Sequence, residues 1–207
     1  LYEGFSFEDS TAKIKLNNLE TLYRITQKII SILDIDELLN TIMDLALETL
    51  KGERGMIFLL ENGDLKLKVA RNVEKQTVLD ASEISYSVIK DVASGGKPIL
   101  TMDAMGDEKL MQRQSIMNFN IKSLVCVPIK LKDKILGTVY VDSTGKTESI
   151  VAFTNIDLEF LEAFAGIVGI SIENARLLKD LKDENIYLRN EVEEKYRFEN
   201  IIGKSEA

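Results

Sequence analysis

Apolar residues recur at helical spacing in two stretches near the start of the chain. In the first stretch, Leu19, Leu22 and Ile29 fall on one face of a helix, after an irregular and acidic beginning. In the second, Asp34 has the position of a helix cap and Gly52 that of a stop. The pattern therefore predicts two consecutive helices, the second of them beginning at the Asp34 cap.

The hydrophobic period then changes from that of helices to that of strands. Residues 56–60 form a continuous apolar run, and apolar positions alternate with lysines over 65–69. Between them stands Asn62-Gly63, a pair that tolerates the positive φ angles of a two-residue hairpin turn. A second hairpin is predicted from 123–131 and 135–142. Hairpins indicate antiparallel pairing.

The segments between and after the hairpins complete the predicted order. Apolar spacing indicates a short helix ended by Gly95-Gly96, then a strand over 98–103 and another short helix over 107–118 in a long crossover. Thr154 is predicted to cap a final helix that continues to about Tyr196, with the Thr154 hydroxyl accepting a free backbone N–H. The fold class is α+β: a central, mostly antiparallel sheet flanked by helices.

Composition excludes several classes of function. The chain has 207 residues, a net charge of −8, one Cys and no His. Catalytic triads that use His, His-based metal sites, intrachain disulfides and CxxC redox pairs are therefore absent, and a reducing cytoplasm is the expected location. The acidic balance argues against binding of nucleic-acid phosphates by this segment. The longest stretch of small and apolar residues, 163–172, is too short to cross a bilayer, so no membrane contact is expected.

The order and the amino-acid sequences of five segments resemble a GAF domain over residues 17–182. The tail RFENIIGKSEA resembles the opening of the AAA+ ATPase domain in sigma-54-dependent transcriptional activators of the NtrC and NifA class. We therefore expect a piece of a longer protein, divided into an irregular extension (1–16), a GAF sensor domain (17–182), a coiled-coil linker (183–196) and the start of an AAA+ domain (197–207). The five matching segments are SILDIDELLNTIMDLALETL, RGMIFLLENGDLKLKVARN, SGGKPILTMDA, IKSLVCVPIKLKDKILGTVYVDS and FTNIDLEFLEAFAGIVGISIENARLL.

The resemblance implies a regulatory role without catalysis in this segment. GAF domains have a six-stranded antiparallel sheet, with helices that pair with a second subunit on one face and a small-molecule pocket under crossover loops on the other. In activators of this class the module controls the downstream ATPase. ATP, DNA and sigma-54 RNA polymerase are then contacted only by other domains. A GAF module of a histidine kinase, or a ligand-free dimerisation scaffold, is the alternative.

Other functional motifs known in proteins of this kind are incomplete. Gly203-Lys204-Ser205 lacks the Gly that a phosphate-binding loop needs five residues earlier, because position 198 is Phe. The pattern of cyclic-nucleotide-binding GAF domains fails at Leu158, where the family has Glu. The bilin-binding Cys–His pair and the several cysteines of methionine sulfoxide reductases of GAF fold are missing. We therefore expect no hydrolysis, no bilin and no thiol-based catalysis.

Candidate ligand contacts come from the strands and the crossover of the resembling fold. Met side chains there can repack around a ligand or simply fill space, and Arg71, Arg113 and Lys122 could grip an anionic ligand such as a 2-oxo acid. Cys126 is expected to be a small apolar filler; the alternative, from nitric-oxide-sensing activators, is non-haem iron near Arg71, Asp103, Cys126 and Asp142. We expect no metal or other cofactor. The candidate set is Arg71, Met102, Asp103, Met111, Arg113, Cys126 and Tyr140.

The last helix carries a heptad-like apolar seam. Alternating spacings of three and four residues with one amide are typical of a short coiled coil, in which a buried Asn fixes register. This seam predicts a homodimer whose helices pass a small-molecule signal onward. The candidate dimer and linker residues are Leu22, Ile29, Leu178, Leu181, Asn185, Leu188 and Val192.

Overall fold

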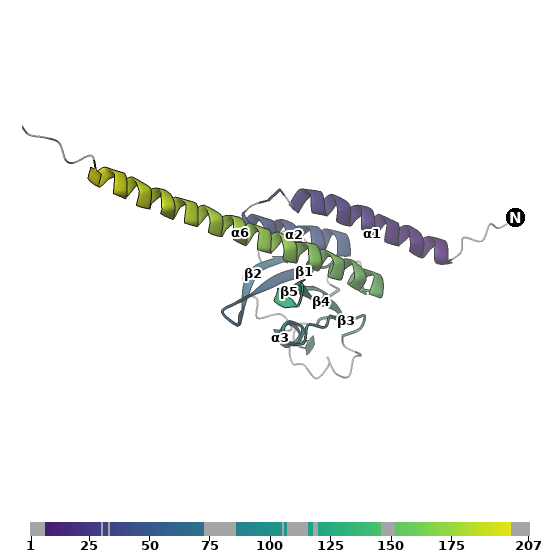
Figure 1. Cartoon of the computed structure of the whole chain (residues 1–207). Coiled ribbons are helices and arrows are strands. Elements are labelled where there is room, and N and C mark those ends of the chain that lie inside the picture. Colours follow the sequence, from purple (N-terminus) through teal and green to yellow (C-terminus); the bar gives the residue numbers. More distant parts are fainter. Residues whose placement is uncertain are drawn as a thin grey trace, which may run out of the picture.

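The computed structural model describes residues 7–29, 31–32, 34–72, 86–104, 106, 116–117, 120–145 and 152–199. Its elements confirm the α+β class and the predicted order (Figure 1). The expected helix over 107–118 lies almost wholly outside the described residues. The elements are α1 (Phe7–Ile29), α2 (Ile35–Leu50), β1 (Arg54–Glu61), β2 (Asp64–Asn72), α3 (Tyr86–Gly95), β3 (Ile99–Thr101), β4 (Ser123–Leu131), β5 (Lys134–Ser143) and α6 (Asn155–Glu199).

The sheet is antiparallel throughout, in the order β2-β1-β5-β4-β3. Six strands were implied by the family resemblance, whereas the described part of the chain contributes five. Both hairpins are confirmed. Asn62 and Gly63 have φ angles of 53° and 87°, as a type I′ turn requires, and Lys132 has a φ of 54° in the β4–β5 turn.

The two ends of α2 follow local hydrogen bonding and packing, with one departure from expectation. The Asp34 carboxylate accepts the backbone N–H groups of Asp36 and Glu37 at 3.0 and 2.9 Å, as a cap should. The left-handed residue after α2 is Lys51 rather than Gly52. Gly52 is instead required by packing, because a Cβ there would lie 2.3 Å from Val141 Cγ1.

The two outer helices also differ in detail from the sequence prediction. α1 begins at Phe7, inside the segment 1–16 that was expected to be irregular; this segment contains only Gly4 as a helix breaker, so nothing after it stops a helix. At the start of α6 the Thr154 hydroxyl donates to the Asp157 carboxylate at 2.7 Å, instead of accepting a backbone N–H. The Thr154 backbone N–H donates to the same oxygen at 2.7 Å.

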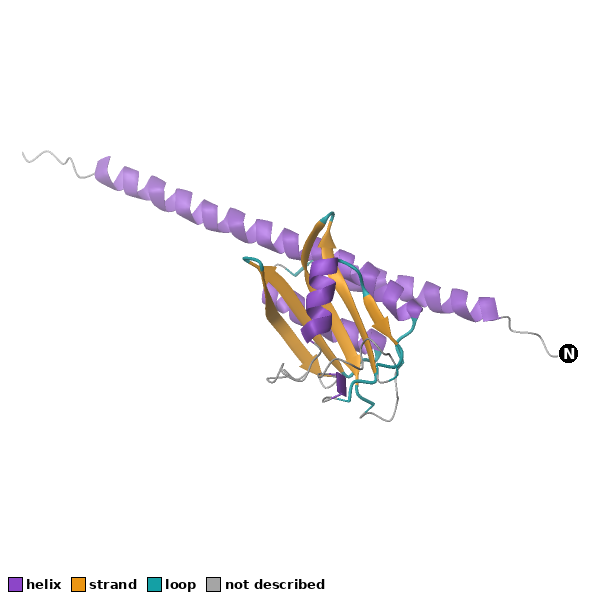
Figure 2. Ribbon diagram, turned by 90° about the horizontal axis from the view of Figure 1, so that it is seen from below, coloured by secondary structure: helices purple, strands orange, loops and turns teal. Residues whose placement is uncertain are grey.

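The sheet separates two buried clusters. The helix face packs against α1, α2 and α6, while α3 covers the opposite face, called here the α3 face (Figures 1 and 2). Alternation along β5 shows the division: Val139 and Val141 belong to the helix-face cluster and Tyr140 to the α3-face cluster. Apolar burial on both faces therefore fixes the register of the central strands.

The long helix α6 has two parts with different surroundings. Up to Ala175 it buries one side on the sheet, with Phe164, Val168 and Ile172 fully enclosed. From Leu177 onward every residue whose side chain is described is exposed, and this part projects away from the sheet (Figure 1). No helix among the described residues has the length and apolarity needed to cross a bilayer.

Candidate functional site

The interior of the α3 face is built by adjacent residues of three central strands. Tyr140 of β5 pairs with Met56 of β1 on one side and with Cys126 of β4 on the other. All three side chains are fully buried. Burial raises the pKa of the Cys126 thiol far above its ordinary value. Cys126 is therefore a neutral apolar filler at physiological pH and not a reactive thiolate.

A buried ionic network lies next to this interior at one end of the sheet. Arg54 Nε and Nη2 donate to the two oxygens of Asp142 at 2.9 and 2.7 Å, and Tyr140 Oη donates to Asp142 Oδ2 at 2.8 Å. The Asp142 side chain is 0% exposed and that of Arg54 is 13% exposed. Burial raises the pKa of Asp142, and the two hydrogen-bonded partners act in the opposite direction. The pKa of Tyr140 is raised by burial and by the adjacent carboxylate.

A second carboxylate joins the same strand ends. Glu53 accepts the Thr144 backbone N–H at 2.8 Å and the Thr144 hydroxyl at 2.6 Å, and its own backbone N–H donates to the Asp142 carbonyl at 2.9 Å. The start of β1 and the end of β5 are thereby held together by both main-chain and side-chain bonds. Sequence reasoning missed Glu53 and Arg54; the available signal is an ionic pair placed directly before a continuous apolar strand.

The structure brings together only part of the predicted ligand set. Cys126 and Tyr140 are neighbours on the α3 face. Arg71 lies on the helix face, where its Nε is 3.6 Å from Asp44 Oδ1 of α2. Met102 is 53% exposed, outside the buried cluster. Asp103 accepts the Gly106 backbone N–H at 3.0 Å.

Two further members of that set, Met111 and Arg113, lie outside the described residues. Lys122 contributes backbone bonds to Ser143 and Ala104. The set weighed for iron is split by the sheet, because Arg71 is on the face opposite Cys126. No cluster of three or more potential Cys, Asp or Glu ligands occurs in the part of the chain that the structure describes.

The predicted dimer residues differ in accessibility. Ile29 is fully buried in the helix-face cluster and Leu22 packs against it, so these two α1 residues stabilise their own subunit. The reason is that α1 has two apolar stripes: Leu22 and Ile29 lie on the inward one, whereas Leu19, which the sequence pattern placed on the same face, lies on the outward one. That outward stripe is Leu16, Leu19 and Tyr23, each more than half exposed. On α6, the apolar seam residues are exposed as a coiled coil requires: Leu178, Leu181, Leu188 and Val192.

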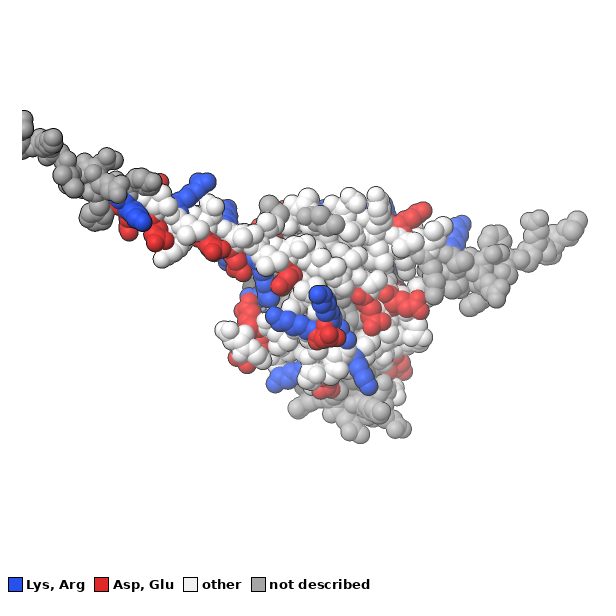
Figure 3. Space-filling view, viewed as in Figure 1, with Lys and Arg blue, Asp and Glu red and all other residues white. Residues whose placement is uncertain are grey.

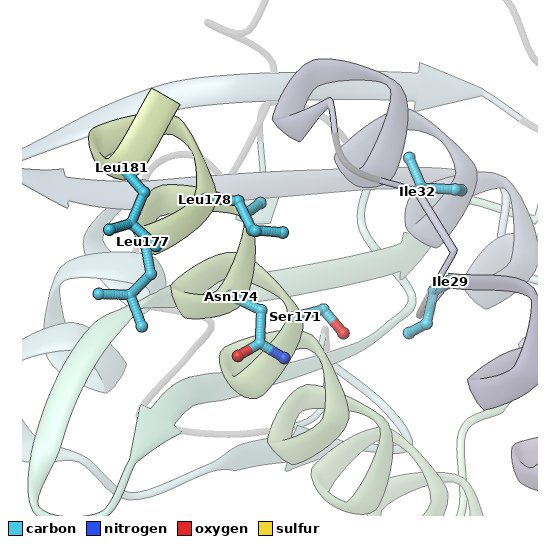
Figure 4. Close-up of a pocket in the computed structure, with 8 residues that line it drawn as sticks. Ile29, Ile32, Ser171, Asn174, Leu177, Leu178 and Leu181 are labelled. Atoms are coloured by element: carbon cyan, nitrogen blue, oxygen red, sulfur yellow. The ribbon is translucent and has the colours of Figure 1, made fainter. Parts of the chain in front are cut away.

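An apolar groove of about 340 Å³ lies where α1 ends beside α6. Ile29 and Ile32 border one side, and Asn174, Leu178 and other α6 residues border the other (Figure 4). The groove continues into the exposed seam, since Leu178 and Leu181 belong to both. An open apolar groove that joins an open apolar helix face is typical of an interaction surface.

Comparisons with known proteins match this chain to one domain family and to two distant relatives. Residues 34–172 match the GAF domain family. The chain is 23% identical over 201 residues to the Nif-specific regulatory protein of Herbaspirillum seropedicae, covering 92% of this chain and 37% of that protein. It is also 23% identical over 205 residues to the nitrogen fixation protein AnfA of Azotobacter vinelandii, covering 94% of this chain and 38% of the relative. The chain thus spans well under half the length of both relatives.

The fold is shared with a solved enzyme structure. The free methionine-R-sulfoxide reductase of Neisseria meningitidis superposes with a TM-score of 0.62 at 18% identity, covering 86% of this chain and 98% of that one. At this identity the likeness establishes the fold alone. The family match extends over most of the central sheet and its flanking helices. This chain therefore belongs to the GAF domain family, as a regulatory domain distantly related to the two nitrogen-fixation proteins.

Proposed function

We propose that this chain is the sensory module of a cytoplasmic transcriptional activator of the sigma-54-dependent class, acting as a homodimer. The observation that carries the proposal is the double role of α6, which is part of the folded core up to Ala175 and an exposed apolar seam beyond it. The distant similarity to the Nif-specific regulatory protein supports the class. Contacts with DNA, ATP and sigma-54 RNA polymerase are assigned to domains beyond this chain.

The proposed mechanism is allosteric. A small molecule binds on the α3 face, under the crossover between β2 and β4, and changes how the sheet packs on α6. Gly169 brings α6 against the backbone of β4, because a Cβ there would lie 2.5 Å from the Lys130 carbonyl oxygen. A displacement of β4 is therefore passed directly to the helix. For a tenfold shift in the equilibrium between the two packings of the sheet on α6, the free energies with which the ligand binds them must differ by about 1.4 kcal/mol.

Catalysis by this chain is not part of the proposal. The solved reductase shares the fold, and a thiol-based reaction would need an accessible thiolate. Here the sole cysteine, Cys126, is fully buried and its pKa is raised by that burial. The buried Asp142 is held by Arg54 and Tyr140, which serves structure.

A ligand-free scaffold is the second candidate, favoured by one observation. Met56, Cys126 and Tyr140 fill the α3-face interior and are each 0% exposed. In that case the domain contributes dimerisation only, and its α3 face is a second core without a ligand.

A thermal-shift screen separates the sensor from the scaffold. The purified chain is heated with 2-oxo acids, nucleotides and amino acids in turn. A ligand at about 100 times its Kd adds about 2.7 kcal/mol of stability, which raises the Tm of a domain of this size by roughly 5–10 °C. One class of compound is expected to give this shift. No shift with any compound supports the scaffold, and turnover of a compound contradicts the non-catalytic assignment.

A further inference from the structure

The projecting part of α6 has a regular heptad that extends from Leu178 to Val192. Leu178, Asn185 and Val192 occupy a positions, and Leu181 and Leu188 occupy d positions. All five side chains are exposed in the single subunit. The next d position is Lys195, whose charge ends the apolar seam. The seam is thus only about two heptads long, too short to be stable as an isolated helix pair.

The positions that flank this seam carry charges sorted by sign. The e positions are basic, Lys182 and Arg189, while the charged g positions are acidic, Glu184 and Glu191. All four side chains are exposed. Figure 3 shows acidic and basic side chains interspersed along the projecting helix. In two-stranded coiled coils, e and g residues of the two helices lie beside the seam and set orientation.

The sorting of charges distinguishes the possible orientations of two such helices. In a parallel, in-register pair, each g residue faces the e residue five positions later on the other helix. Glu184 then faces the partner subunit's Arg189, an attractive pair that occurs twice. In an antiparallel pair, g faces g and e faces e, so acids oppose acids and bases oppose bases in every register.

The groove beside α1 fits the same arrangement. Its α6 lining includes Asn174, Leu177, Leu178 and Leu181, which are the four residues that form the hole for an a-position knob. In a parallel, in-register pair the knob that enters this hole is the partner subunit's Leu178. Ile29 and Ile32 border the same groove, so the first layer of the seam lies against the α1–α2 corner.

We propose that the projecting part of α6 binds a second copy of this chain in parallel and in register, with orientation set by the Glu184–Arg189 pairs. This inference rests on the homodimer of the proposed function and adds its geometry. The consequence is that both signalling helices leave the dimer at the same end. A domain that follows this segment in one subunit would then lie beside the same domain of the other subunit.

The test is a charge swap followed by sedimentation equilibrium at low salt. Glu184→Arg places like charges together in the parallel pair and is expected to weaken the dimer by roughly tenfold. Arg189→Glu is expected to do the same, and the Glu184→Arg, Arg189→Glu double variant to restore the affinity to within about twofold of the original. Asp183→Arg makes the same charge change at an outward f position and is the matched control, expected to have little effect.

The opposite result is equally specific. In an antiparallel pair Glu184→Arg relieves acid–acid repulsion where Glu184 faces the partner subunit's Glu191, and exchanges it for base–base repulsion where Glu184 faces the partner subunit's Glu184. A dimer as tight as the original or tighter therefore overturns the parallel arrangement while leaving the homodimer intact. Failure of the double variant to recover also overturns it. An original chain that is monomeric in sedimentation contradicts the homodimer itself. In about 1 M salt the effect of the single substitutions should shrink, because the charges are exposed.

Discussion

Arg54→Met is expected to lower the free energy of unfolding by about 3–5 kcal/mol. The substitution keeps a long apolar stem but removes both hydrogen bonds to Asp142, a carboxylate that is 0% exposed. Tyr140 remains as a single donor at 2.8 Å, which is too little to replace a bidentate guanidinium. The measurement is urea unfolding of the original and variant chains at one protein concentration.

The matched control for this variant is Arg71→Met. Arg71 lies on the edge strand β2, next to β1; its Nε is 3.6 Å from Asp44 Oδ1, and both side chains retain solvent contact, at 20% and 25% exposure. A loss of about 1 kcal/mol or less is expected. Equal losses for the two variants would show that the Arg54–Asp142 pair contributes no more to the free energy of unfolding than the Arg71–Asp44 pair.

The Arg54→Met variant should also depend on pH in a defined direction. Burial already raises the pKa of Asp142, and removal of Arg54 raises it further. The folded state then binds a proton that the unfolded state releases, over the window from the ordinary carboxyl pKa of 3.8 up to the raised value. Stability of the variant therefore falls as pH rises through that window. The Arg54→Met, Asp142→Asn double variant should lose this dependence.

Gly169→Ala is expected to destabilise the domain by about 2 kcal/mol or more, although Ala favours helices. An added Cβ would stand 2.5 Å from the Lys130 carbonyl oxygen, a backbone atom that cannot move without shifting β4. The same helix offers a matched control at Gly166, where a Cβ meets nothing within 4 Å. Gly166→Ala should stabilise by roughly 0.5–1 kcal/mol.

Thermal unfolding of both glycine variants at one protein concentration measures this contrast. Opposite signs are the expected result. Stabilisation by both substitutions would mean that α6 is not in close contact with the β4 backbone at Gly169. The proposed coupling between the sheet and the projecting part of α6 would then lack the contact on which it depends.

Features set by neighbouring residues could be predicted from the sequence. The Asn62-Gly63 turn, the Asp34 cap and the central strands depend on local φ angles, local hydrogen bonds and short hydrophobic periods. The α6 seam could also be predicted, because a heptad is a local pattern. These signals specified the fold class and the exposed face of α6.

Features set by register or by distant packing could not be predicted. Arg54 and Asp142 are separated by 88 positions and meet only through the β1–β5 register. Arg71 was expected near Cys126, but a shift of one residue in a strand moves a side chain to the other face, and Arg71 lies with Asp44. Ile29 and Leu19 both suit an apolar helix stripe. Only the packing of α1 on α6 decides that Ile29 is buried and Leu19 exposed.

The central claim is that the projecting seam of α6 joins two copies of the chain. Sedimentation of the original 207-residue chain beside an Asn185→Lys, Leu188→Lys double variant tests it most directly. The account predicts a dimer for the original chain and a monomer for the variant, since two lysines per helix would be placed in the apolar seam. A variant that remains as dimeric as the original chain would show that the seam is not the interface.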